Sequence, residues 1–415
     1  MKRNFTDFIE AYLDYSSGHE ATTKIHLWTV LSVLAGAMER KVWMNRGYYT
    51  LFPNLYIFII GRSGLIKKST STSIGIDLLK EVPDIKFMSE RLTAASLIDQ
   101  MHNARKKFEI GDQQISQSPL YAYASELLVL MNEVYGQTTE LLTTFYDCQP
   151  NDPKKPWVYK ARHQDAVKIF GPCLNILGAS TEAWLKKCIP VSEMEGGFTA
   201  RAVFVVENKG PDKFVAWPEY SERRVAMKAK LIEDLIWINE LKGEVKIHPQ
   251  MKQDFTDWYQ YHMKEVVTPN TDGRFTGYLA RKGDLLLKLS MIRSVSKRDD
   301  LYILPSHFEW AGQVLESVEE GMFNAFDLGA DKPEKSSSME TVISNFNVQD
   351  FIKSKGKASK EEVRAHFNVK KNGGPLADSL RNLVEMGTVD IESNNDTQYF
   401  VYKDYAEKME EDILP

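Results

Sequence analysis

The first sixty residues carry three clear patterns of apolar and polar positions. Apolar side chains recur at helical spacing over residues 5–40, with Thr22 or Thr23 as a possible cap for a second helix. Short apolar runs on either side of residues 45–47 predict a hairpin. The segment 54–61 has six apolar or aromatic residues in a row before Gly61, which predicts a strand buried on both faces.

Between residues 61 and 206, helical and strand patterns alternate. Helices are predicted at 68–79, 92–106 and 141–146, with a further helical stretch at 127–131 and Thr93 as a possible cap. Buried strands are predicted at 120–124, 173–178 and 201–206. This alternation predicts an α/β domain with a mainly parallel sheet.

The character of the chain changes after residue 216. Residues 216–330 are mostly helical, and a short polar linker follows at 331–338. Beyond it, three helical patterns precede two strand patterns, which is the order of a winged-helix domain. We therefore expect an N-terminal helical region and hairpin at 1–50, an α/β core at 51–215, a helical lid at 216–330 and a winged helix at 338–405.

Composition narrows the class of protein. The 415 residues have a formal net charge of −5, so a histone-like or ribosomal basic protein is excluded. The apolar fraction of 43% is enough to bury a core, which argues against a disordered chain. The three cysteines form no CxxC pair, and the eight histidines show no metal spacing. The N-terminus lacks a signal-peptide pattern, and the longest apolar stretch, 27–38, is too short to span a bilayer. These features predict a soluble cytoplasmic protein.

The segment GRSGLIKKST at 61–70 follows a buried strand and opens a predicted helix. This is the context of a P-loop, in which backbone N–H groups and the helix N-terminus bind phosphates. A lysine of such a loop neutralises the β and γ oxygens, and a hydroxyl holds Mg²⁺. Lys68 and Ser69 would fill these roles for ATP. The remaining candidate nucleotide-binding positions of the loop are Gly61, Gly64, Lys67 and Thr70.

The spacing of this loop is irregular. The standard pattern is G-x-x-x-x-G-K-[ST], whereas six residues separate Gly61 from Lys68 here and Lys67 takes the place of the second glycine. We expect a side chain at Lys67 to be tolerated if the residue keeps a negative φ. The alternative is an ordinary strand–turn–helix with a basic cap.

A second signal follows the strand at 120–124. Apolar residues ending in an acid form the Walker B pattern, in which an Asp binds the Mg²⁺-linked water and a following Glu activates the attacking water. Ser125 occupies the Asp position at the metal, and Glu126 occupies the Glu position as candidate general base. One carboxylate in place of two weakens metal binding. The alternative is a surface carboxylate that starts a helix.

Three further polar residues are candidates for contact with the nucleotide. Thr181 ends the strand beside Walker B, where a polar group could contact the γ-phosphate. Arg201 closes the glycine-rich segment 195–201 before a strand and could stabilise transition-state charge on the nucleotide of a neighbouring subunit. Arg281 could reach the nucleotide from the lid. The alternatives are an arginine paired with a nearby acid for Arg201 and a solvated helix face for Arg281.

Together these segments resemble a family of phage and mobile-element P-loop ATPases related to replicative helicases. The similarity runs from about residue 5 to about residue 325. Its matching pieces are FPNLY at 52–56, the loop at 61–70, ASEL at 124–127, LTTFYD at 142–147, LGAST at 177–181 and GFTAR at 197–201. In that family the elongated loop with a basic residue before the lysine recurs. The helical segment 277–314 is also similar to the lid of AAA+ DNA helicases of the minichromosome-maintenance type, which a winged helix follows.

The resemblance implies a ring-forming ATPase, hexameric in such families, that acts on DNA during phage or plasmid replication in a bacterial or archaeal host cell. In such rings Arg201 would act in trans. The cofactors implied are ATP and Mg²⁺. The partners implied are single-stranded or forked DNA, further copies of the chain and, as a further candidate, other replication proteins, without a membrane.

Two basic segments are candidates for DNA contact. The first, at 152–164, interleaves basic and aromatic residues as stacking platforms for single strands do; its candidates are Lys154, Lys155, Trp157, Lys160 and Arg162. The second spans 353–371, where seven basic residues against two acids give a local charge of +5; its candidates are Lys357, Lys360, Arg364, Lys370 and Lys371. The alternatives are a solvated hairpin for the first segment and a protein-binding or ring-ordering unit for the second.

Three functions fit these signals. The first is an ATP-driven DNA helicase or translocase. The second is a replication initiator or helicase loader that uses ATP as an assembly switch. The third is a nucleotide-binding scaffold with weak hydrolysis, because the loop is altered and the Walker B pattern has a single acid.

Overall fold

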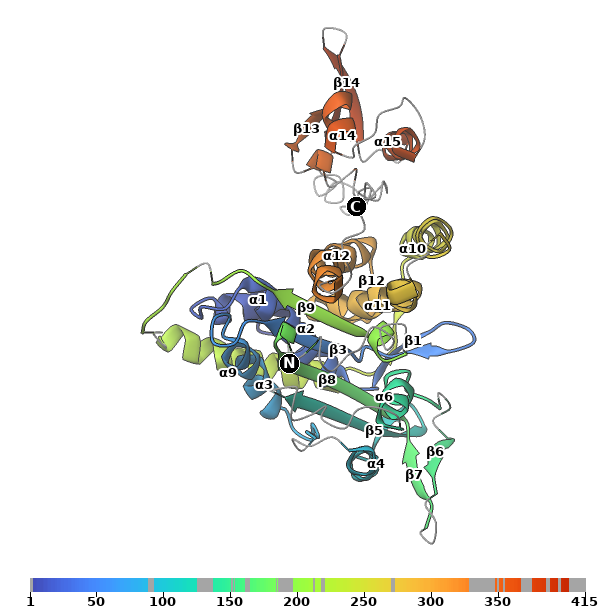
Figure 1. Cartoon of the computed structure of the whole chain (residues 1–415). Coiled ribbons are helices and arrows are strands. Elements are labelled where there is room, and N and C mark those ends of the chain that lie inside the picture. Colours follow the sequence, from blue (N-terminus) through green and yellow to red (C-terminus); the bar gives the residue numbers. More distant parts are fainter. Residues whose placement is uncertain are drawn as a thin grey trace, which may run out of the picture. The chain divides into compact units, whose positions relative to one another are not determined.

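The computed structural model describes residues 3–402 apart from the following: 89–92, 125–136, 151, 153, 161–164, 184, 186–196, 212, 218–220, 270–272, 328–347, 349–350, 354, 367–374, 386–388 and 395–396. The chain divides into two compact units, Met1–Leu328 and Gly329–Pro415, and each is described by itself. The fold is mixed α/β, as the alternation of helical and strand patterns predicted (Figure 1).

A five-stranded sheet forms the centre of the first unit. Its strand order is β4-β5-β8-β3-β9, with bounds β3 (Tyr56–Gly61), β4 (Lys106–Ile110), β5 (Gln113–Ala124), β8 (Pro172–Ser180) and β9 (Ala202–Glu207). The strands β3, β5, β8 and β9 run parallel, and β4 is antiparallel to β5. Every residue of β3 and β9 is buried, which explains their unbroken apolar runs. The strand β4 was not predicted, because residue 106 was assigned to the end of a helix.

The register of the parallel strands aligns their carboxyl ends. Ile60 of β3 lies opposite Ser180 of β8, and Gly61 lies opposite Glu207 of β9. On the other side of β8, Ala124 of β5 lies opposite Gly178. Ligands of open α/β sheets bind outside the carboxyl ends of the strands, where the strand order reverses. The edge that holds Gly61 is therefore the expected place for a ligand.

Helices near both ends of the first unit cover the sheet. The helix α2 (Thr23–Met38) packs against β3, β8 and β9, and α1 (Phe8–Ser16), α3 (Lys68–Lys80) and α9 (Glu222–Glu240) pack around α2 (Figure 1). Because α2 is enclosed in this way, residues 28–38 are all buried, which accounts for the apolar stretch in the sequence. Of the helices that the structure describes, none combines the length and the apolar character needed to cross a membrane.

The remaining helices of the first unit border the sheet. The helix α4 (Ala94–Asn103) packs against β5, and Thr93 caps it by accepting from the Ser96 amide at 3.1 Å, as predicted. The helix α6 (Gln137–Tyr146) packs against β8. The helical region contains α10 (Pro249–Tyr261), a π-helical turn His262–Val267, α11 (Gly273–Lys297) and α12 (Pro305–Asp327), with α12 packed on β9.

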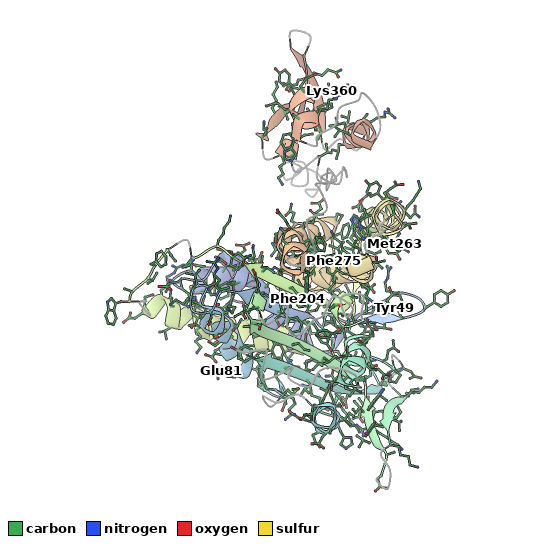
Figure 2. The ribbon with its side chains drawn as sticks, in the orientation of Figure 1. Tyr49, Glu81, Phe204, Met263, Phe275 and Lys360 are labelled. Carbon is green, nitrogen blue, oxygen red and sulfur yellow. The ribbon has the colours of Figure 1, made fainter. Side chains whose placement is uncertain are left out.

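The helical region and the sheet share one hydrophobic core. Phe204 of β9 lies 5.0 Å from Phe326 of α12 between ring centroids, and Phe275 of α11 lies 6.1 Å from the same ring (Figure 2). The core also includes side chains of α1 and α2. The three segments predicted before residue 330 therefore pack as one unit.

Short strands complete the first unit. The strands β1 (Val42–Asn45) and β2 (Thr50–Leu51) form the predicted hairpin, and β10 (Gly243–Glu244) pairs with β1. The strands β11 (Lys246–Ile247) and β12 (Tyr302–Ile303) pair with each other. The strands β6 (Pro156–Tyr159) and β7 (Val167–Phe170) form a second hairpin, which extends away from the five-stranded sheet in Figure 1.

The second unit has its own core and a small antiparallel sheet. The strands β13 (Lys357–Ser359), β14 (Val389–Asn394) and β15 (Thr397–Tyr402) are ordered β13-β15-β14. The helices α14 (Lys360–His366) and α15 (Pro375–Glu385) contribute Val363, Leu380 and Leu383 to its core. The two predicted terminal strands are present, whereas β13 is a third strand that the sequence pattern did not predict.

Candidate functional site

The loop at 61–67 connects β3 to α3 and depends on glycine at two positions. A Cβ atom on Gly61 would lie 2.4 Å from the Glu207 carbonyl oxygen and 2.4 Å from the Ile66 side chain, so only glycine fits. Gly64 has φ +73°, a left-handed backbone that disfavours other residues, although space around it is open. The first glycine is therefore required by packing and the second by backbone conformation.

Lys68 begins α3, and its side chain returns over this loop. Its Nζ donates to the Gly61 carbonyl oxygen at 2.6 Å and to the Arg62 carbonyl oxygen at 3.2 Å. The residue is only 9% exposed, and burial lowers the pKa of its ammonium group below the usual value. Two neutral carbonyls compensate the ammonium charge less well than an anion would. The predicted role of Lys68, neutralising the β and γ oxygens of a nucleotide, stays a prediction.

Lys67 does not meet the condition set from the sequence. Its backbone is left-handed, with φ 49° and ψ 35°, rather than at negative φ. The reason is local: Lys67 is the N-cap of α3, and the loop turns sharply there to enter the helix, at the place where the standard pattern has glycine. Such a conformation costs a non-glycine residue about 1–3 kcal/mol. The side chain reaches outward and pairs with Glu20, with 3.6 Å between Nζ and Oε2.

The N-cap residue of α3 does not hydrogen-bond the helix backbone with its side chain. The Lys67 side chain turns outward to Glu20 instead, so it does not cap the first N–H groups of the helix. The first turn is held in place by Tyr123 of β5, whose hydroxyl lies 3.0 Å from the Thr72 hydroxyl and 3.5 Å from the Ser69 carbonyl oxygen. Ser69 and Thr70 therefore follow an uncapped helix N-terminus on a fixed support, a geometry that suits an anion.

The neighbouring strand ends lie at the same edge as this loop. Ser180 pairs with Ile60, so Thr181 follows β8 beside the loop. The strand β5 ends at Ala124, one strand further along. Ser125 and Glu126, the Walker B candidates, come directly after it but lie outside the described residues.

Arg201 and Arg281 converge on a carboxylate that the sequence did not mark as functional. Arg201 donates from Nε to Asp147 Oδ1 at 2.9 Å and from Nη2 to Asp147 Oδ2, and its Nη1 donates to the Gly197 carbonyl at 2.5 Å. Arg281 Nη1 lies 3.5 Å from Asp147 Oδ1. The Arg201 side chain is 5% exposed and that of Asp147 is 28% exposed. This geometry matches the alternative considered for Arg201, an arginine paired with a nearby acid.

This arginine pair lies at the opposite end of β3 from the loop. Arg201 precedes Ala202, which pairs with Tyr56 at the start of β3, whereas Gly61 ends the strand. Six residues of parallel strand span roughly 17 Å. Within one chain, neither arginine reaches a ligand on the loop.

The first basic segment forms the β6–β7 hairpin. The Trp157 and Tyr159 rings stack on each other with centroids 6.1 Å apart and an interplanar angle of 3°, and Trp157 also contacts Phe145 of α6 edge-on. Trp157 is therefore partly structural, and Tyr159 and Val158 are the exposed apolar positions, at 39% and 53%. Lys154, Lys155 and Lys160 are exposed, and Arg162 lies outside the described residues.

Ion pairs occupy part of the second basic segment. Lys355 Nζ lies 2.9 Å from Glu362 Oε1, and Lys357 Nζ lies 2.5 Å from Glu392 Oε2. Lys360 and Arg364 are half-buried on α14, whereas Lys370 and Lys371 lie outside the described residues. The charge available to a phosphate in this segment is therefore smaller than the sequence count suggested.

Sequence reasoning missed the acidic partners of the basic candidates. Asp147 was part of a recognised motif, but only the fold places it against Arg201. Glu20 and Glu207 lie on the turn before α2 and at the end of β9, and both contact residues at the loop. No local pattern indicates the contacts of these three carboxylates, because each contact joins residues more than forty positions apart.

Comparison of this sequence with protein-family models gave no match, and comparison with curated proteins gave none. The candidate function therefore rests on the residues and the geometry above.

Proposed function

We propose that this chain is an ATP-hydrolysing, ring-forming DNA helicase or translocase of phage or mobile-element replication. In this proposal residues 51–215 are a P-loop core, 216–330 a lid and 338–405 a winged helix. The observation that carries the proposal is the buried Lys68 ammonium, held over a glycine-containing loop between a buried strand and an uncapped helix. The loop lies at the carboxyl edge of a mainly parallel sheet, where nucleotides bind in such folds.

The residues present fit a Mg²⁺–nucleotide. The backbone of Gly64 and the first N–H groups of α3 would bind phosphate oxygens, and Lys68 would exchange its two carbonyl contacts for them. The Ser69 hydroxyl, on a first turn fixed by Tyr123, would hold Mg²⁺. Thr181 follows the adjacent strand, and the Walker B position supplies Ser125 at the metal and Glu126 as general base. The metal would neutralise charge on the phosphates, and the chain would position the attacking water.

In this proposal Arg201 and Arg281 act on a nucleotide only when several copies of the chain assemble. Because Arg201 and Arg281 lie at the far end of β3 from the loop of their own chain, they would serve the nucleotide of a neighbouring subunit. Asp147 would hold Arg201 in place before the neighbour binds. A ring would thus complete each site from two chains.

DNA contact would come from the β6–β7 hairpin and from α14 and its flanks. Lys154 and Lys155 precede β6 and Lys160 follows it, and the strand carries the exposed Tyr159, a combination that suits a phosphate backbone with unstacked bases. DNA contact confined to these two segments is compatible with a net charge of −5, because most of the acidic residues lie outside them.

The pairing of Arg201 with Asp147 favours a second candidate function. An arginine that stays bonded to its own chain contributes nothing to a neighbour's nucleotide, and the protein would then be a nucleotide-binding scaffold with little turnover. A replication initiator or loader shares ATP hydrolysis with the helicase, but like the scaffold it does not separate strands.

The test measures ATP hydrolysis with Mg²⁺, with and without single-stranded DNA, and separation of a forked duplex. We expect DNA-stimulated hydrolysis that Lys68→Ala and Glu126→Gln reduce at least 100-fold, because Lys68 would stabilise charge on the transferred phosphoryl and Glu126 would activate the attacking water. Lys80→Ala, at the exposed end of the same helix, is the control. Hydrolysis without strand separation would favour the initiator or loader, and ATP binding without hydrolysis would favour the scaffold.

A further inference from the structure

The turn between α1 and α2 contacts two segments that are distant from it in sequence: the loop at 61–67 and the segment 207–215. Glu20, on the turn between α1 and α2, pairs with Lys67, and its Oε1 accepts from the Val215 amide at 2.9 Å. On the same turn, Thr22 donates to Glu207 Oε2 at 3.1 Å, and Lys24 lies 3.7 Å from that oxygen. The segment 17–24 is thus fixed both to the loop and to the segment that follows β9. We call these contacting residues the junction: Glu20, Thr22, Lys24, Lys67, Glu207 and Val215.

A buried histidine lies next to the junction, against the His19 ring. His26, in the first turn of α2, is 3% exposed, and neither of its ring nitrogens has a partner among the described residues. The hydroxyl of Tyr12, whose ring centroid is 6.3 Å from that of His26, is also buried without a partner in this part of the chain. Burial lowers the pKa of His26 to about 3, so the imidazole is neutral near pH 7.

His19 connects His26 to the junction. Its ring meets the His26 ring edge-on, with centroids 5.4 Å apart, and it belongs to the same turn as Glu20. Its Nδ1 accepts from the Ala21 amide at 3.2 Å, which leaves the proton on Nε2. His19 is only half-buried, so it forms the accessible face in front of His26.

The cluster formed by Tyr12, His19 and His26 has a chemistry that indicates which class of ligand it would bind. Buried polar groups in folded proteins are nearly always paired, and unpaired ones call for a ligand or water. A neutral imidazole offers one donor and one acceptor, the complement of the polar edge of a nucleobase. The cations beside it are already engaged, Lys67 by Glu20, Lys24 by Glu207 and Lys213 by the Ser17 carbonyl. An uncharged heteroaromatic ring therefore fits this cluster better than a phosphate.

We propose that the junction binds the nucleobase of the nucleotide: the His19 ring, which now covers His26, turns aside to lie against the base, and the exposed His26 nitrogens then hydrogen-bond its polar edge. The inference rests on the proposed function, because the loop at 61–69 would hold the phosphates of the same molecule. The pairing of Lys67 with Glu20 then has a role: it joins the phosphate subsite to the base subsite. The left-handed backbone of Lys67 aims this side chain away from the phosphates and toward the turn.

Isothermal titration with ATP, GTP and inorganic tripolyphosphate, each with Mg²⁺, tests the inference. The variants are His26→Phe, which keeps an aromatic ring but removes both nitrogens, and His19→Ala. We expect each to weaken binding of the preferred nucleotide about tenfold, or about 1.4 kcal/mol, and to reduce discrimination between ATP and GTP. Tripolyphosphate, which has no base, should bind all three proteins equally. His102→Ala, an exposed histidine at the end of α4, is the control.

The outcomes separate this inference from the proposed function. If wild type binds tripolyphosphate and nucleotides but both histidine variants retain nucleotide affinity and base discrimination, the base subsite lies elsewhere. If a variant loses tripolyphosphate and nucleotide equally, its effect is structural, and the inference fails. If wild type binds neither, the proposed function fails and the inference with it. A thermal melt of each variant verifies folding, and His19→Ala decides the matter should His26→Phe not fold.

Discussion

The pairing of Arg201 with Asp147 makes an asymmetric prediction about stability. The Arg201 side chain is 5% exposed and has no carboxylate partner other than Asp147 among the described contacts, whereas Asp147 is 28% exposed and also lies 3.5 Å from Arg281. Asp147→Ala leaves a buried guanidinium without a counter-ion, which costs about 3–5 kcal/mol. Arg201→Ala leaves a carboxylate that water and Arg281 still reach, so we expect a cost of about 1–2 kcal/mol.

Urea unfolding followed by tryptophan fluorescence measures these costs. All eight tryptophans lie in the first unit, so the signal reports that unit without interference from the second. We expect the double variant to lose less than the two single variants combined, because its second substitution removes a group already unpaired. The coupling free energy should be about 1–2 kcal/mol.

Two results would refute this reasoning. A loss below about 1 kcal/mol for Asp147→Ala would mean that the guanidinium is not desolvated as the structure indicates. A larger loss for Arg201→Ala than for Asp147→Ala would contradict the difference in burial between the partners. Hydrolysis by mixed assemblies of Arg201→Ala and Lys68→Ala chains tests the role in trans separately: recovery of activity supports it, and no recovery argues against it.

Three further predictions concern other parts of the first unit. Lys288 is fully buried, and burial lowers its pKa to about 8. Between pH 8 and 10.5 the unfolded state therefore binds more protons than the folded state, so the free energy of unfolding should rise with pH in that window. Parallel urea titrations of wild type and Lys288→Met should show a rise of up to about 3 kcal/mol in wild type relative to the variant. Gly61→Ala should abolish nucleotide binding in the titration assay, because its Cβ meets the Glu207 carbonyl, whereas Gly47→Ala, at positive φ in open space, should cost only about 1 kcal/mol of stability and leave binding intact. Lys155→Ala should reduce the salt dependence of single-strand binding by about 0.7 in the slope of log K against log salt, and an unchanged slope would remove the hairpin from the DNA interface.

Much of the sheet was predictable because buried parallel strands leave a strong local signal. The strands β3, β8 and β9 appear in the sequence as unbroken apolar runs, and the structure buries nearly every residue in them. The cap of α4 at Thr93 was predictable for the same reason, since a cap involves only its own helix. The strands β4 and β13 were missed, because half-exposed residues lack that apolar run and their partners β5 and β15 define them.

The sequence by itself determined the local element: a glycine-containing loop with a lysine and hydroxyls between a buried strand and a helix, which predicts a phosphate-binding loop. Local spacing was sufficient for this prediction, because the backbone donors of such a loop and the helix N-terminus lie within a few residues of one another. Only the tertiary structure decided what these residues contact. It placed Lys67 at positive φ against Glu20, paired Arg201 with Asp147 at the far end of β3, and buried His26 against the His19 ring. Such contacts join segments tens to hundreds of residues apart, and their free energy depends on burial and geometry that no periodic pattern encodes.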